Sequence, residues 1–204
     1  MKAIVTIGLP ASGKSTFAKT LEPQGFIVIE RDRIRKSLAG ESEFSWETWD
    51  LQNEKKVTEI EREAIGDAAK QKRSIVVSDT NLNARHREEL LAHLKRLGFE
   101  IELVLFDAPC SICEERNLRR PKSEQVPFDL IPKLNATFVK DRAELLKTVD
   151  RIVRPDPCCG ICRYFELSDS YFGFCVHRAN PRKEVVHTAC HPACSRFEPM
   201  KTFS

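Results

Sequence analysis

The chain of 204 residues has no apolar run close to the roughly 20 residues that a membrane-spanning helix needs. Internal repeats and low-complexity tracts are missing as well. A hydrophobic fraction of 41% and a charged fraction of 31% are typical of folded globular proteins, and they exclude gross disorder. The length predicts one α/β domain of ordinary size with a small appendage, and we expect no membrane partner.

Strong net charge is also missing, since the formal value is only +3. Overall charge therefore gives no argument for a nucleic-acid partner. Local clusters could still bind a polyanion. They are Arg31/Arg33/Arg35/Lys36 and Arg116/Arg119/Arg120/Lys122. The alternative is that both clusters are solvated helix faces.

The first residues, from Met1 to Ile7, superficially resemble a short signal peptide. They continue directly into a glycine-rich loop that cleavage would destroy, so we interpret them as a buried first strand. We therefore expect a cytoplasmic location.

Strand-like and helix-like segments alternate up to about Arg154. Short apolar runs rich in β-branched residues predict strands at 3–8, 26–29, 74–79, 100–106 and 151–153. Helical stretches lie between them at 14–21, 31–38, about 46–71, 84–97, 111–118 and 128–148. This alternation predicts a parallel sheet with helices on both faces, whose ligands bind beyond the carboxyl ends of the strands.

The segment Gly8-Leu9-Pro10-Ala11-Ser12-Gly13-Lys14-Ser15-Thr16 fits the phosphate-loop (P-loop) pattern G-x-x-x-x-G-K-[ST], between a predicted strand and a predicted helix. The glycines permit backbone angles that turn amide groups inward around an anion. The start of the following helix adds the positive end of its dipole. Lys14 would bridge the β- and γ-phosphates of ATP, and the Ser15 hydroxyl would bind Mg²⁺. The pattern predicts nucleotide binding but does not choose among kinase, GTPase and motor.

A kinase also needs a carboxylate beside the acceptor hydroxyl, and Asp32 follows the second predicted strand at the edge where the P-loop opens. Asp32 could accept the hydroxyl proton, or it could only cap the next helix. Arg35, one helical turn later, could hold an acceptor phosphate. After the third strand, Asp79, Thr80 and Asn81 could steer Mg²⁺ or the acceptor, or could only form a turn and cap a helix.

Arg116 and Arg120 are spaced i and i+4 on the predicted fifth helix, just before the loop-like residues 121–125. Such a segment could act as a lid that lowers the two arginines onto ATP. Arginine suits this task because its planar group can hydrogen-bond two phosphate oxygens.

Together these segments resemble the kinase domain of the bacteriophage polynucleotide 5′-kinase family over residues 1 to about 150. The pieces that match, in family order, are Thr6-Ile7-Gly8, Ser12-Gly13-Lys14-Ser15-Thr16, Arg31-Asp32 with Arg35, Ser78-Asp79-Thr80-Asn81-Leu82-Asn83, Arg116-Asn117 with Arg120, and Val126-Pro127. The resemblance implies a P-loop kinase fold, ATP and Mg²⁺ as cofactors, and 5′-OH ends of DNA or RNA as partners.

For individual residues the resemblance implies Asp32 as general base, Arg35 on the acceptor phosphate and Arg116 and Arg120 on the ATP phosphates. It further implies that Asp79, Thr80 and Asn81 help to form the acceptor site. Arg33-Ile34 departs from the acidic-aromatic pair expected beside the base. No Asp-x-Asp-x-Thr motif of the phosphatase domain that often accompanies this kinase is present, so we expect kinase activity without phosphatase activity.

The composition changes at Arg154-Pro155-Asp156-Pro157, which predicts a kinase domain at 1–154 and a cysteine-rich module at 155–204. Cys159, Cys162, Cys175 and Cys194 would form a four-thiolate structural zinc site, with Cys190 as an alternative ligand. His187, His191 and Cys158 lie nearby, and the surplus of ligands keeps an iron–sulfur cluster open, as well as no metal at all. Cys110 and Cys113 have no second pair nearby, so we interpret them as buried or capping residues.

These interpretations predict an ATP-dependent polynucleotide 5′-hydroxyl kinase. One alternative keeps the P-loop and the base but has a small hydroxyl compound as acceptor. Another is a nucleic-acid-binding module that ATP switches, without transfer. The acceptor nucleic acid and the oligomeric state stay open.

Overall fold

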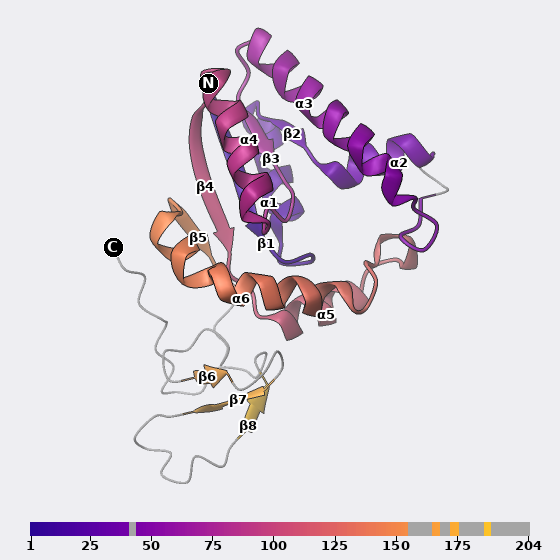
Figure 1. Cartoon of the computed structure of the whole chain (residues 1–204), viewed down its shortest axis with the longest axis vertical. Helices are drawn as coiled ribbons and strands as arrows, with labels where there is room; N and C mark the ends of the chain where they lie inside the picture. The colour runs from indigo at the N-terminus through magenta and orange to yellow at the C-terminus, as the bar shows by residue number, and fades with distance from the viewer. Residues whose placement is uncertain (41–43, 155–164, 168–171, 176–185, 189–204) are drawn as a thin grey trace.

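The computed structural model describes residues 1–40, 44–154, 165–167, 172–175 and 186–188 (Figure 1). The main domain is built on a five-stranded sheet in the order β2-β3-β1-β4-β5, and every neighbouring pair is parallel. The strands are β1 (Lys2–Gly8), β2 (Ile27–Ile29), β3 (Ile75–Val77), β4 (Glu100–Phe106) and β5 (Arg151–Val153). The predicted α/β fold with a parallel sheet is therefore confirmed.

Helices connect and cover the strands on both faces of the sheet (Figure 1). They are α1 (Lys14–Leu21), α2 (Arg31–Ala39), α3 (Glu54–Lys70), α4 (Ala84–Arg96), α5 (Cys110–Leu118) and α6 (Leu130–Thr148). Single turns of 3-10 helix lie at Glu22–Gln24 (η1), Leu51–Asn53 (η2) and Lys122–Glu124 (η3). Because all neighbouring strands are parallel, their carboxyl ends all open at one edge of the sheet.

Successive residues of the central strand β1 pack into different layers of the core. Ala3 and Val5 contact the layer formed with α3 and α4, while Ile4 contacts the layer formed with α1. Ile7, at the end of the strand, packs with residues of α5 and α6. The strand is thus buried on both faces, which explains its largely apolar sequence.

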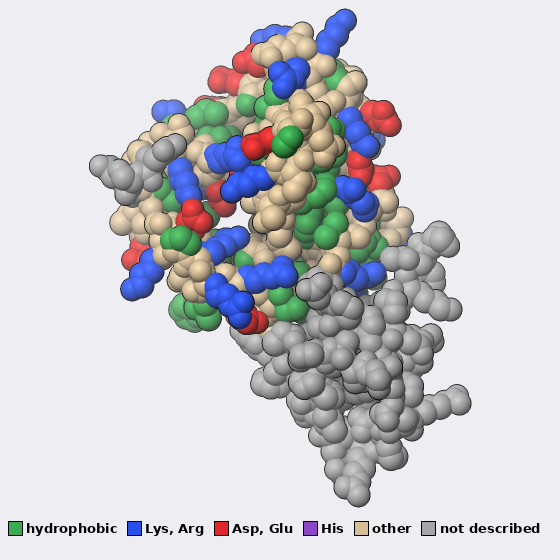
Figure 2. All heavy atoms as spheres, turned by 180° about the vertical axis from the view of Figure 1, so that it is seen from behind, with side chains coloured by type: hydrophobic (Ala, Val, Ile, Leu, Met, Phe, Trp, Pro, Cys, Tyr) green, Lys and Arg blue, Asp and Glu red, His purple; other side chains and the backbone are tan. Residues whose placement is uncertain are grey.

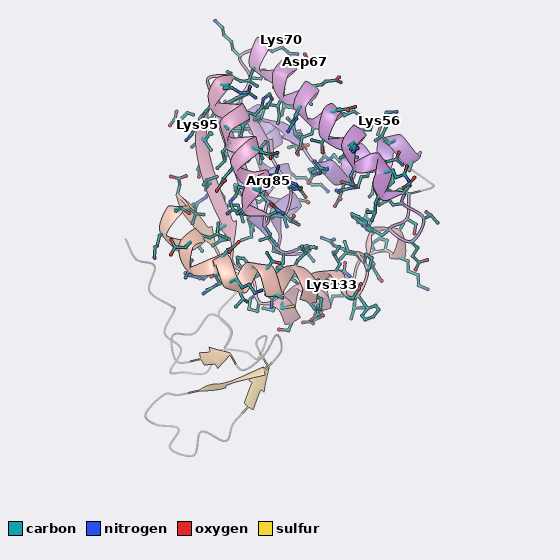
Figure 3. All side chains as sticks on the ribbon, viewed as in Figure 1. Lys56, Asp67, Lys70, Arg85, Lys95 and Lys133 are labelled. Atoms are coloured by element: carbon teal, nitrogen blue, oxygen red, sulfur yellow. The ribbon has the colours of Figure 1, made fainter. Side chains whose placement is uncertain are left out.

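The outer faces of the helices carry charge, as Figure 3 shows for Lys56, Asp67 and Lys70 on α3 and for Arg85 and Lys95 on α4. Ion pairs at this surface, such as Lys70 with Asp67 at 2.9 Å, are exposed and stabilise the fold little.

A buried carboxylate joins three elements at the carboxyl edge of the sheet. Asp107 follows β4 and is only 4% exposed. Its two oxygens each accept a hydrogen bond of 2.7 Å from Arg142 of α6, and Arg154, just after β5, donates to it at 3.2 Å. The sequence analysis did not single out Asp107, because its partners are at least 35 residues away.

The predicted strands at 100–106 and 151–153 and the predicted helix at 14–21 have the observed bounds. The long helix predicted from about residue 46 begins only at Glu54, so the prediction is wrong for residues 46–53. There the aromatic rings decide the backbone, since Trp46 and Trp49 each pack against Phe44 with ring centroids 5.6 Å apart. Asp50 then accepts a hydrogen bond from the backbone of Gln52 and caps a 3-10 turn.

A separate three-stranded antiparallel sheet, in the order β6-β7-β8, is formed by β6 (Phe165–Leu167), β7 (Phe172–Cys175) and β8 (Val186–Thr188). Of the predicted zinc ligands, Cys175 ends β7, while Cys159, Cys162, Cys190 and Cys194 lie outside the described residues. No helix within the described ranges is both long and apolar enough to cross a membrane.

Candidate active site

The P-loop follows β1 directly and has the geometry that its glycines predict. A Cβ atom on Gly8 would lie 2.7 Å from the carbonyl oxygen of Phe106, so only glycine fits beside β4. Gly13 has φ of 109°, in the left-handed region, where it turns the chain into α1. The start of α1 therefore presents free backbone N–H groups toward the loop, as an anion site requires.

Lys14 lies folded into the P-loop, and it is only 7% exposed. Its Nζ donates to the carbonyl oxygens of Gly8 at 3.0 Å and Leu9 at 2.6 Å, and it lies 3.4 Å from the Ser12 hydroxyl. Burial lowers the pKa of Lys14 to about 8, against the smaller opposing effect of Asp79. Burial in the P-loop thus disfavours the protonated form of Lys14. A bound phosphate would favour that form again.

A cavity of about 890 Å³ opens over the P-loop. Figure 2 views the molecule from behind and shows Lys and Arg side chains around a hollow of the main domain. The cavity is lined by Pro10, Ala11, Ser12, Gly13, Lys14, Ser15 and Thr16 of the loop and α1, and by Asp32, Arg35, Asp79, Thr80, Arg116 and Arg120. Of the site residues predicted from the sequence, Gly8 and Asn81 are the two main-domain positions that do not line it.

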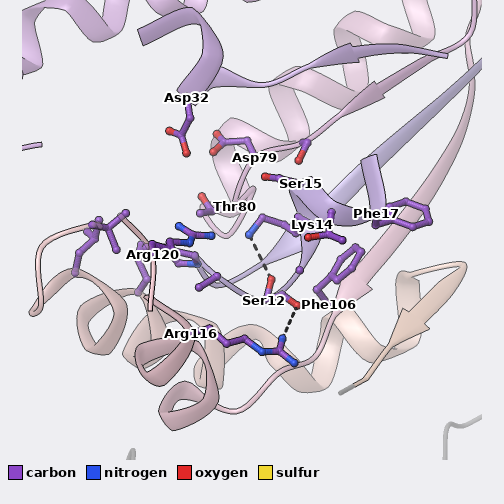
Figure 4. A pocket seen from close by; sticks show the side chains of 18 of the residues that line it. Ser12, Lys14, Ser15, Phe17, Asp32, Asp79, Thr80, Phe106, Arg116 and Arg120 are labelled. Carbon is purple, nitrogen blue, oxygen red and sulfur yellow. Dashed lines mark hydrogen bonds between the residues drawn. The ribbon is translucent and has the colours of Figure 1, made fainter. Parts of the chain in front are cut away.

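Asp32, which Figure 4 labels, and Arg35 both lie on α2 and line this cavity. The N-cap of α2 is Glu30, so the alternative that Asp32 is only a helix cap is wrong. The Asp32 carboxylate is 59% exposed and accepts a hydrogen bond of 2.5 Å from Arg35. An acceptor molecule can therefore reach both groups from the cavity.

Glu54, the first residue of α3, holds the arginines of α2, and the sequence analysis did not identify it. It accepts hydrogen bonds from Nε and Nη2 of Arg35 at 2.8 and 2.9 Å, and from Nη2 of Arg31 at 2.9 Å. The indole of Trp49 donates to it at 2.8 Å. Burial opposes the charge of Glu54, but the hydrogen bonds from Arg35, Arg31 and Trp49 outweigh it and lower its pKa to about 2.

The same hydrogen-bond network stabilises the charged forms of Arg31 and Arg35 and raises the pKa of both. Burial opposes the charge of Arg35, yet its hydrogen bond to Glu54 and the charge of Asp32 raise its pKa above the ordinary value. Arg31 also donates to Glu61 at 2.9 Å and lies 3.6 Å from Asp79. Glu61 is buried, and burial raises its pKa in spite of Arg31. A single network thus fixes Arg35 and reaches Asp79.

The segment Asp79-Thr80-Asn81 is tied to the P-loop by its backbone. The N–H of Gly8 donates to the carbonyl oxygen of Thr80 at 3.0 Å, and the side-chain amide of Asn81 donates to the carbonyl oxygen of Thr6 at 2.8 Å. Asn81 has φ of 47°, in the left-handed region, and it does not line the cavity over the P-loop. The cap of α4 is Asn83, whose oxygen accepts from the N–H of His86 at 3.1 Å. Asp79 and Thr80 are therefore free to line the cavity.

Arg116 and Arg120 reach the cavity from α5 and from the loop after it (Figure 4). The expectation that both lie on one helix face is wrong, because α5 ends at Leu118. Buried Asn117 folds the loop back, since its side chain forms hydrogen bonds of 3.1 and 3.0 Å with the backbone N–H and carbonyl of Val126. Arg116 also lies 3.5 Å from the carbonyl oxygen of Ser12 in the P-loop. The end of α5 and the loop after it thus form a fixed rim of the cavity. This rim places the side chains of Arg116 and Arg120 beside the P-loop.

A second cavity, of about 470 Å³, adjoins the first between α3 and α4. The two cavities share the lining residues Arg35, Glu54, Asp79 and Thr80. The second is lined further by Arg62, His86 and His93, among others. The side of the site that holds Asp32 and Arg35 therefore continues beyond the first cavity.

The residues around Ser15 fit a hydrated metal ion. Ser15, Ser78 and Asp79 all line the first cavity. Ser78 is 7% exposed, and its hydroxyl has no hydrogen-bond partner among the described residues. Hydroxyl and carboxylate oxygens are the ligand types that Mg²⁺ accepts, directly or through water.

Cys110 and Cys113 are buried, at 4% and 0% exposure, as predicted. Burial raises the pKa of Cys110 to about 12 and that of Cys113 to about 11, so both thiols are unreactive near neutral pH. No group of three or more His, Cys, Asp or Glu side chains that could hold a metal ion occurs in the part of the chain that the structure describes.

A family model described as "AAA domain" matches residues 4–141, which include the P-loop, Asp32, Asp79 and both rim arginines. The chain belongs to this AAA domain family. Two named proteins are similar to this AAA domain over about two thirds of the chain. The L-seryl-tRNA(Sec) kinase of Methanococcus maripaludis is 26% identical over 141 residues, covering 66% of this chain and 51% of the kinase.

The second is a protein of Autographa californica nuclear polyhedrosis virus that is provisionally named bifunctional polynucleotide kinase/RNA ligase. It is 28% identical over 145 residues, covering 67% of this chain and 21% of the viral protein. The chain thus spans about half the length of the first relative and about a fifth of the second.

Solved structures confirm the fold of this AAA domain. A chain of the Pnkp1/Rnl/Hen1 RNA repair complex superposes with a TM-score of 0.58 at 21% identity, covering 70% of this chain and 45% of that chain. A chain of the AvrRxo1-ORF1:-ORF2 complex with ATP superposes with a TM-score of 0.56 at 18% identity, covering 72% of this chain and 51% of that chain. The fold is that of P-loop kinases, which implies the use of ATP and Mg²⁺.

Proposed function

We propose that this chain transfers the γ-phosphate of ATP to the 5′-hydroxyl of a nucleic acid. The observation that carries the proposal is the pair of adjoining cavities. The first joins the P-loop to Asp32 and Arg35, and the second extends from Arg35 and Asp79 between α3 and α4. A small acceptor would need no such extension, whereas a chain that continues beyond its first nucleotide does.

ATP would lie with its phosphates on the P-loop and its base near the aromatic pair of Phe17 and Phe106. Their ring centroids are 5.5 Å apart, and both phenylalanines line the cavity, as do Val153 and Arg154. Figure 4 shows the two rings on one side of Lys14 and Asp32 on the other. Donor and acceptor would therefore approach the γ-phosphate from opposite sides, as in-line transfer requires.

Six charged residues of the first cavity have roles in this transfer: Lys14, Asp32, Arg35, Asp79, Arg116 and Arg120. The acceptor oxygen forms a bond to the γ-phosphorus while the bond to the β-phosphate oxygen breaks, and ADP leaves. Asp32 takes the proton of the hydroxyl and orients its lone pair. Lys14, Arg116 and Arg120 stabilise the charge on the transferring group. Arg35 contacts the acceptor phosphate, and Asp79 and Thr80 border the acceptor position, with Asn81 holding their turn.

Mg²⁺ would be held by the Ser15 hydroxyl, with Ser78 and Asp79 within reach of its water shell. When bound, it neutralises negative charge on the phosphate oxygens. The unpartnered hydroxyl of Ser78 supports this placement.

The relatives support an acceptor linked to nucleic acid. Their names give a polynucleotide in one case and seryl-tRNA in the other. Both are large acceptors that present a hydroxyl at one end, which agrees with a cavity that continues past the reacting group.

Substitution of Asp32 tests the proposal. Asp32→Asn keeps the size of the side chain and a hydrogen-bond acceptor for Arg35, but it removes the base. We expect transfer from labelled ATP to a 5′-OH oligonucleotide to fall by about 100-fold or more. ATP affinity, measured by calorimetry, should change by less than about twofold, because Asp32 lies on the acceptor side. Asp67→Asn on the outer face of α3 is the matched control and should behave as the wild type.

The acceptors are compared in one assay: a 5′-OH DNA strand, the same strand as RNA, seryl-tRNA, and small sugars and nucleosides. Labelled oligonucleotide from the wild type supports the proposal. Labelling of only the small compounds would contradict it, as would turnover retained in Asp32→Asn. Salt-sensitive binding of oligonucleotides without any labelled product would point to an ATP-switched binding module instead.

For the C-terminal segment we propose a structural zinc site formed by Cys159, Cys162, Cys175 and Cys194, with Cys190 as the alternative ligand. An iron–sulfur cluster on the same thiolates is the competing possibility. The proposal is supported by the ligand type and the spacing of the cysteines.

A further inference from the structure

A buried cluster of charged side chains borders the first cavity at the carboxyl ends of β4 and β5. In this cluster Asp107, only 4% exposed, pairs with the guanidinium groups of Arg142 and Arg154. Arg142 donates a hydrogen bond of 2.7 Å to each carboxylate oxygen, so it balances the charge of Asp107 by itself. The cluster therefore has one positive charge in excess, and Arg154 lines the cavity.

Arg154 is held in place through both its backbone and its side chain. The N–H of Asp107 donates to the carbonyl oxygen of Val153, the residue before Arg154, at 2.9 Å. The Nε of Arg154 donates to the Asp107 carboxylate at 3.2 Å. Among the described residues no group pairs with its two terminal nitrogens, Nη1 and Nη2, although the side chain is only 16% exposed. The planar end of a fixed guanidinium is thus available to a ligand in the cavity.

The position of Arg154 in the sheet places it beside the donor base and not beside the transferring phosphate. Val153 pairs with Phe106 in the ladder between β4 and β5, and the ring of Phe106 packs against Phe17. Figure 4 shows both rings on one side of Lys14. Because Arg154 follows Val153 directly, it borders the part of the cavity where we place the base of the nucleotide.

The chemistry of a guanidinium group distinguishes the two purine bases. Arginine donates hydrogen bonds and accepts none. Guanine presents two neighbouring acceptors, O6 and N7, whereas adenine presents the acceptor N7 next to the amino donor N6. Arginine can therefore form two parallel hydrogen bonds with guanine but only one with adenine, whose amino group would face a second donor.

We propose that Arg154 selects the base of the phosphate donor, and that the chain uses GTP in preference to ATP. The inference rests on the proposed function, because it takes a nucleoside triphosphate as the donor. The P-loop binds the triphosphate whichever base it carries, so ATP is still used, but less well. Asp107 is then a positioning residue, which fixes Arg154 without touching the nucleotide.

Equilibrium binding separates this selection from the transfer. GDP, IDP and ADP, each with Mg²⁺, are titrated into the full chain by calorimetry. The base of IDP keeps O6 and N7 but lacks the amino group of guanine, so it tests only the edge that Arg154 would contact. For the wild type we expect GDP and IDP to bind about tenfold more tightly than ADP. The same preference should appear in kcat/KM for transfer from GTP, ITP and ATP to a 5′-OH oligonucleotide.

Arg154→Met keeps much of the length of the side chain but removes its hydrogen-bond donors. We expect GDP to bind about tenfold more weakly to this variant, with an affinity close to that of ADP. Asp107 keeps both hydrogen bonds from Arg142, so the variant should fold, and its melting temperature checks this. Arg85→Met, on the outer face of α4, is the matched control and should prefer GDP like the wild type.

Asp107→Asn tests the positioning role. It leaves Arg154 in the chain but weakens the contact that fixes its Nε, so the ratio of GDP to ADP affinity should fall. A purely structural role of Asp107 would instead weaken the binding of both nucleotides equally, and that result would contradict the role.

Equal affinities of the wild type for GDP and ADP would overturn the proposal, and so would a preference for GDP that persists in Arg154→Met. Equal transfer from ATP and GTP to the oligonucleotide would overturn it as well, while the kinase function stands. Preferential binding of GDP and IDP without any phosphorylated oligonucleotide would support the selection by Arg154 but contradict the proposed acceptor.

Discussion

Lys14 shows how one residue is prepared for its ligand by burial. Among the described residues, its ammonium group donates hydrogen bonds to the carbonyl oxygens of Gly8 and Leu9 and to the hydroxyl of Ser12. Burial lowers its pKa to about 8, so protonation becomes harder than in water. Phosphate groups would raise the pKa again, because an opposite charge nearby favours the ammonium form.

This difference predicts that nucleotide affinity depends on pH. Below pH 8 Lys14 carries its proton in both states, and affinity should be constant. Above pH 8 the free protein loses the proton while the complex keeps it, so Kd should rise by up to about tenfold per pH unit. Calorimetry of a non-hydrolysable ATP analogue between pH 7 and 9.5 measures this. Binding near pH 8.5 should also take up a proton, seen as a dependence on the ionisation enthalpy of the buffer.

Lys14→Gln serves as the control for this measurement. It should bind more weakly at every pH, and its Kd should stay flat from pH 7 to 9.5. A flat profile in the wild type would show that the loop carbonyls keep Lys14 charged, contrary to the lowered pKa.

The residues that sequence reasoning found and missed differ in how far apart their partners lie. The P-loop, Asp32, Asp79 and Arg116 belong to short motifs, and the structure gathers them around one cavity. Glu54 belongs to no motif, since its partner Arg35 lies 19 residues away and only the packing of α2 on α3 joins them. Long-range partners of this kind leave no local pattern to read.

At the scale of elements, the buried strands and most of the helices were the predictable part. Short apolar runs such as residues 3–5 of β1 and 103–106 of β4 have few alternatives to a buried strand. Residues 46–53 were not predictable, because there the contacts of Trp46 and Trp49 with Phe44 override the helix-like sequence. The end of α5 at Leu118 was predicted correctly, but Arg120 does not continue its face, since Asn117 folds the chain toward Val126 immediately after the helix.

Glu54 is the polar link between α2 and α3, and its removal should affect both stability and acceptor binding. Glu54→Gln keeps the size of the side chain but leaves the charges of Arg31 and Arg35 without their shared counter-charge. We expect the free energy of unfolding to fall by about 1–3 kcal/mol, less than for a fully buried pair because the Glu54 side chain is 29% exposed. KM for the oligonucleotide should rise, through Arg35, while KM for ATP stays the same.

The pH dependence of stability checks that the charge of Glu54 is responsible. A carboxylate whose pKa is lowered to about 2 stabilises the fold fully above its ordinary value of 4.5, and this stabilisation is lost as pH falls from 4.5 toward 2. The difference in unfolding free energy between wild type and Glu54→Gln should therefore shrink between pH 7 and pH 3. A difference that does not change with pH would mean that Glu54 acts through packing alone. Glu144→Gln, an exposed position on α6 whose carboxylate pairs with Lys147 of the same helix, should show little effect at either pH.

At the scale of the whole molecule, the main domain contains every residue that we assign to ATP or to the acceptor. The cavity residues run from Pro10 to Arg154, and the family match covers residues 4–141. The segment 155–204 holds six of the eight cysteines. So short a segment buries little apolar surface, and a bound metal would supply the missing folding energy.

This division predicts that metal content and nucleotide binding can be separated in the full chain. Purified without chelator or oxygen, the wild type should contain about one zinc per chain by mass spectrometry, as expected for one four-thiolate site. Cys175→Ser should lose most of this zinc, because three thiolates hold the ion less tightly, while ATP affinity should change by less than about twofold. Cys110→Ala, on α5, removes a cysteine outside the module and should keep the metal.

Iron with visible absorption in place of zinc would establish a cluster instead. A wild-type chain without either metal would contradict the site, and loss of ATP binding in Cys175→Ser would show that the module supports the kinase domain.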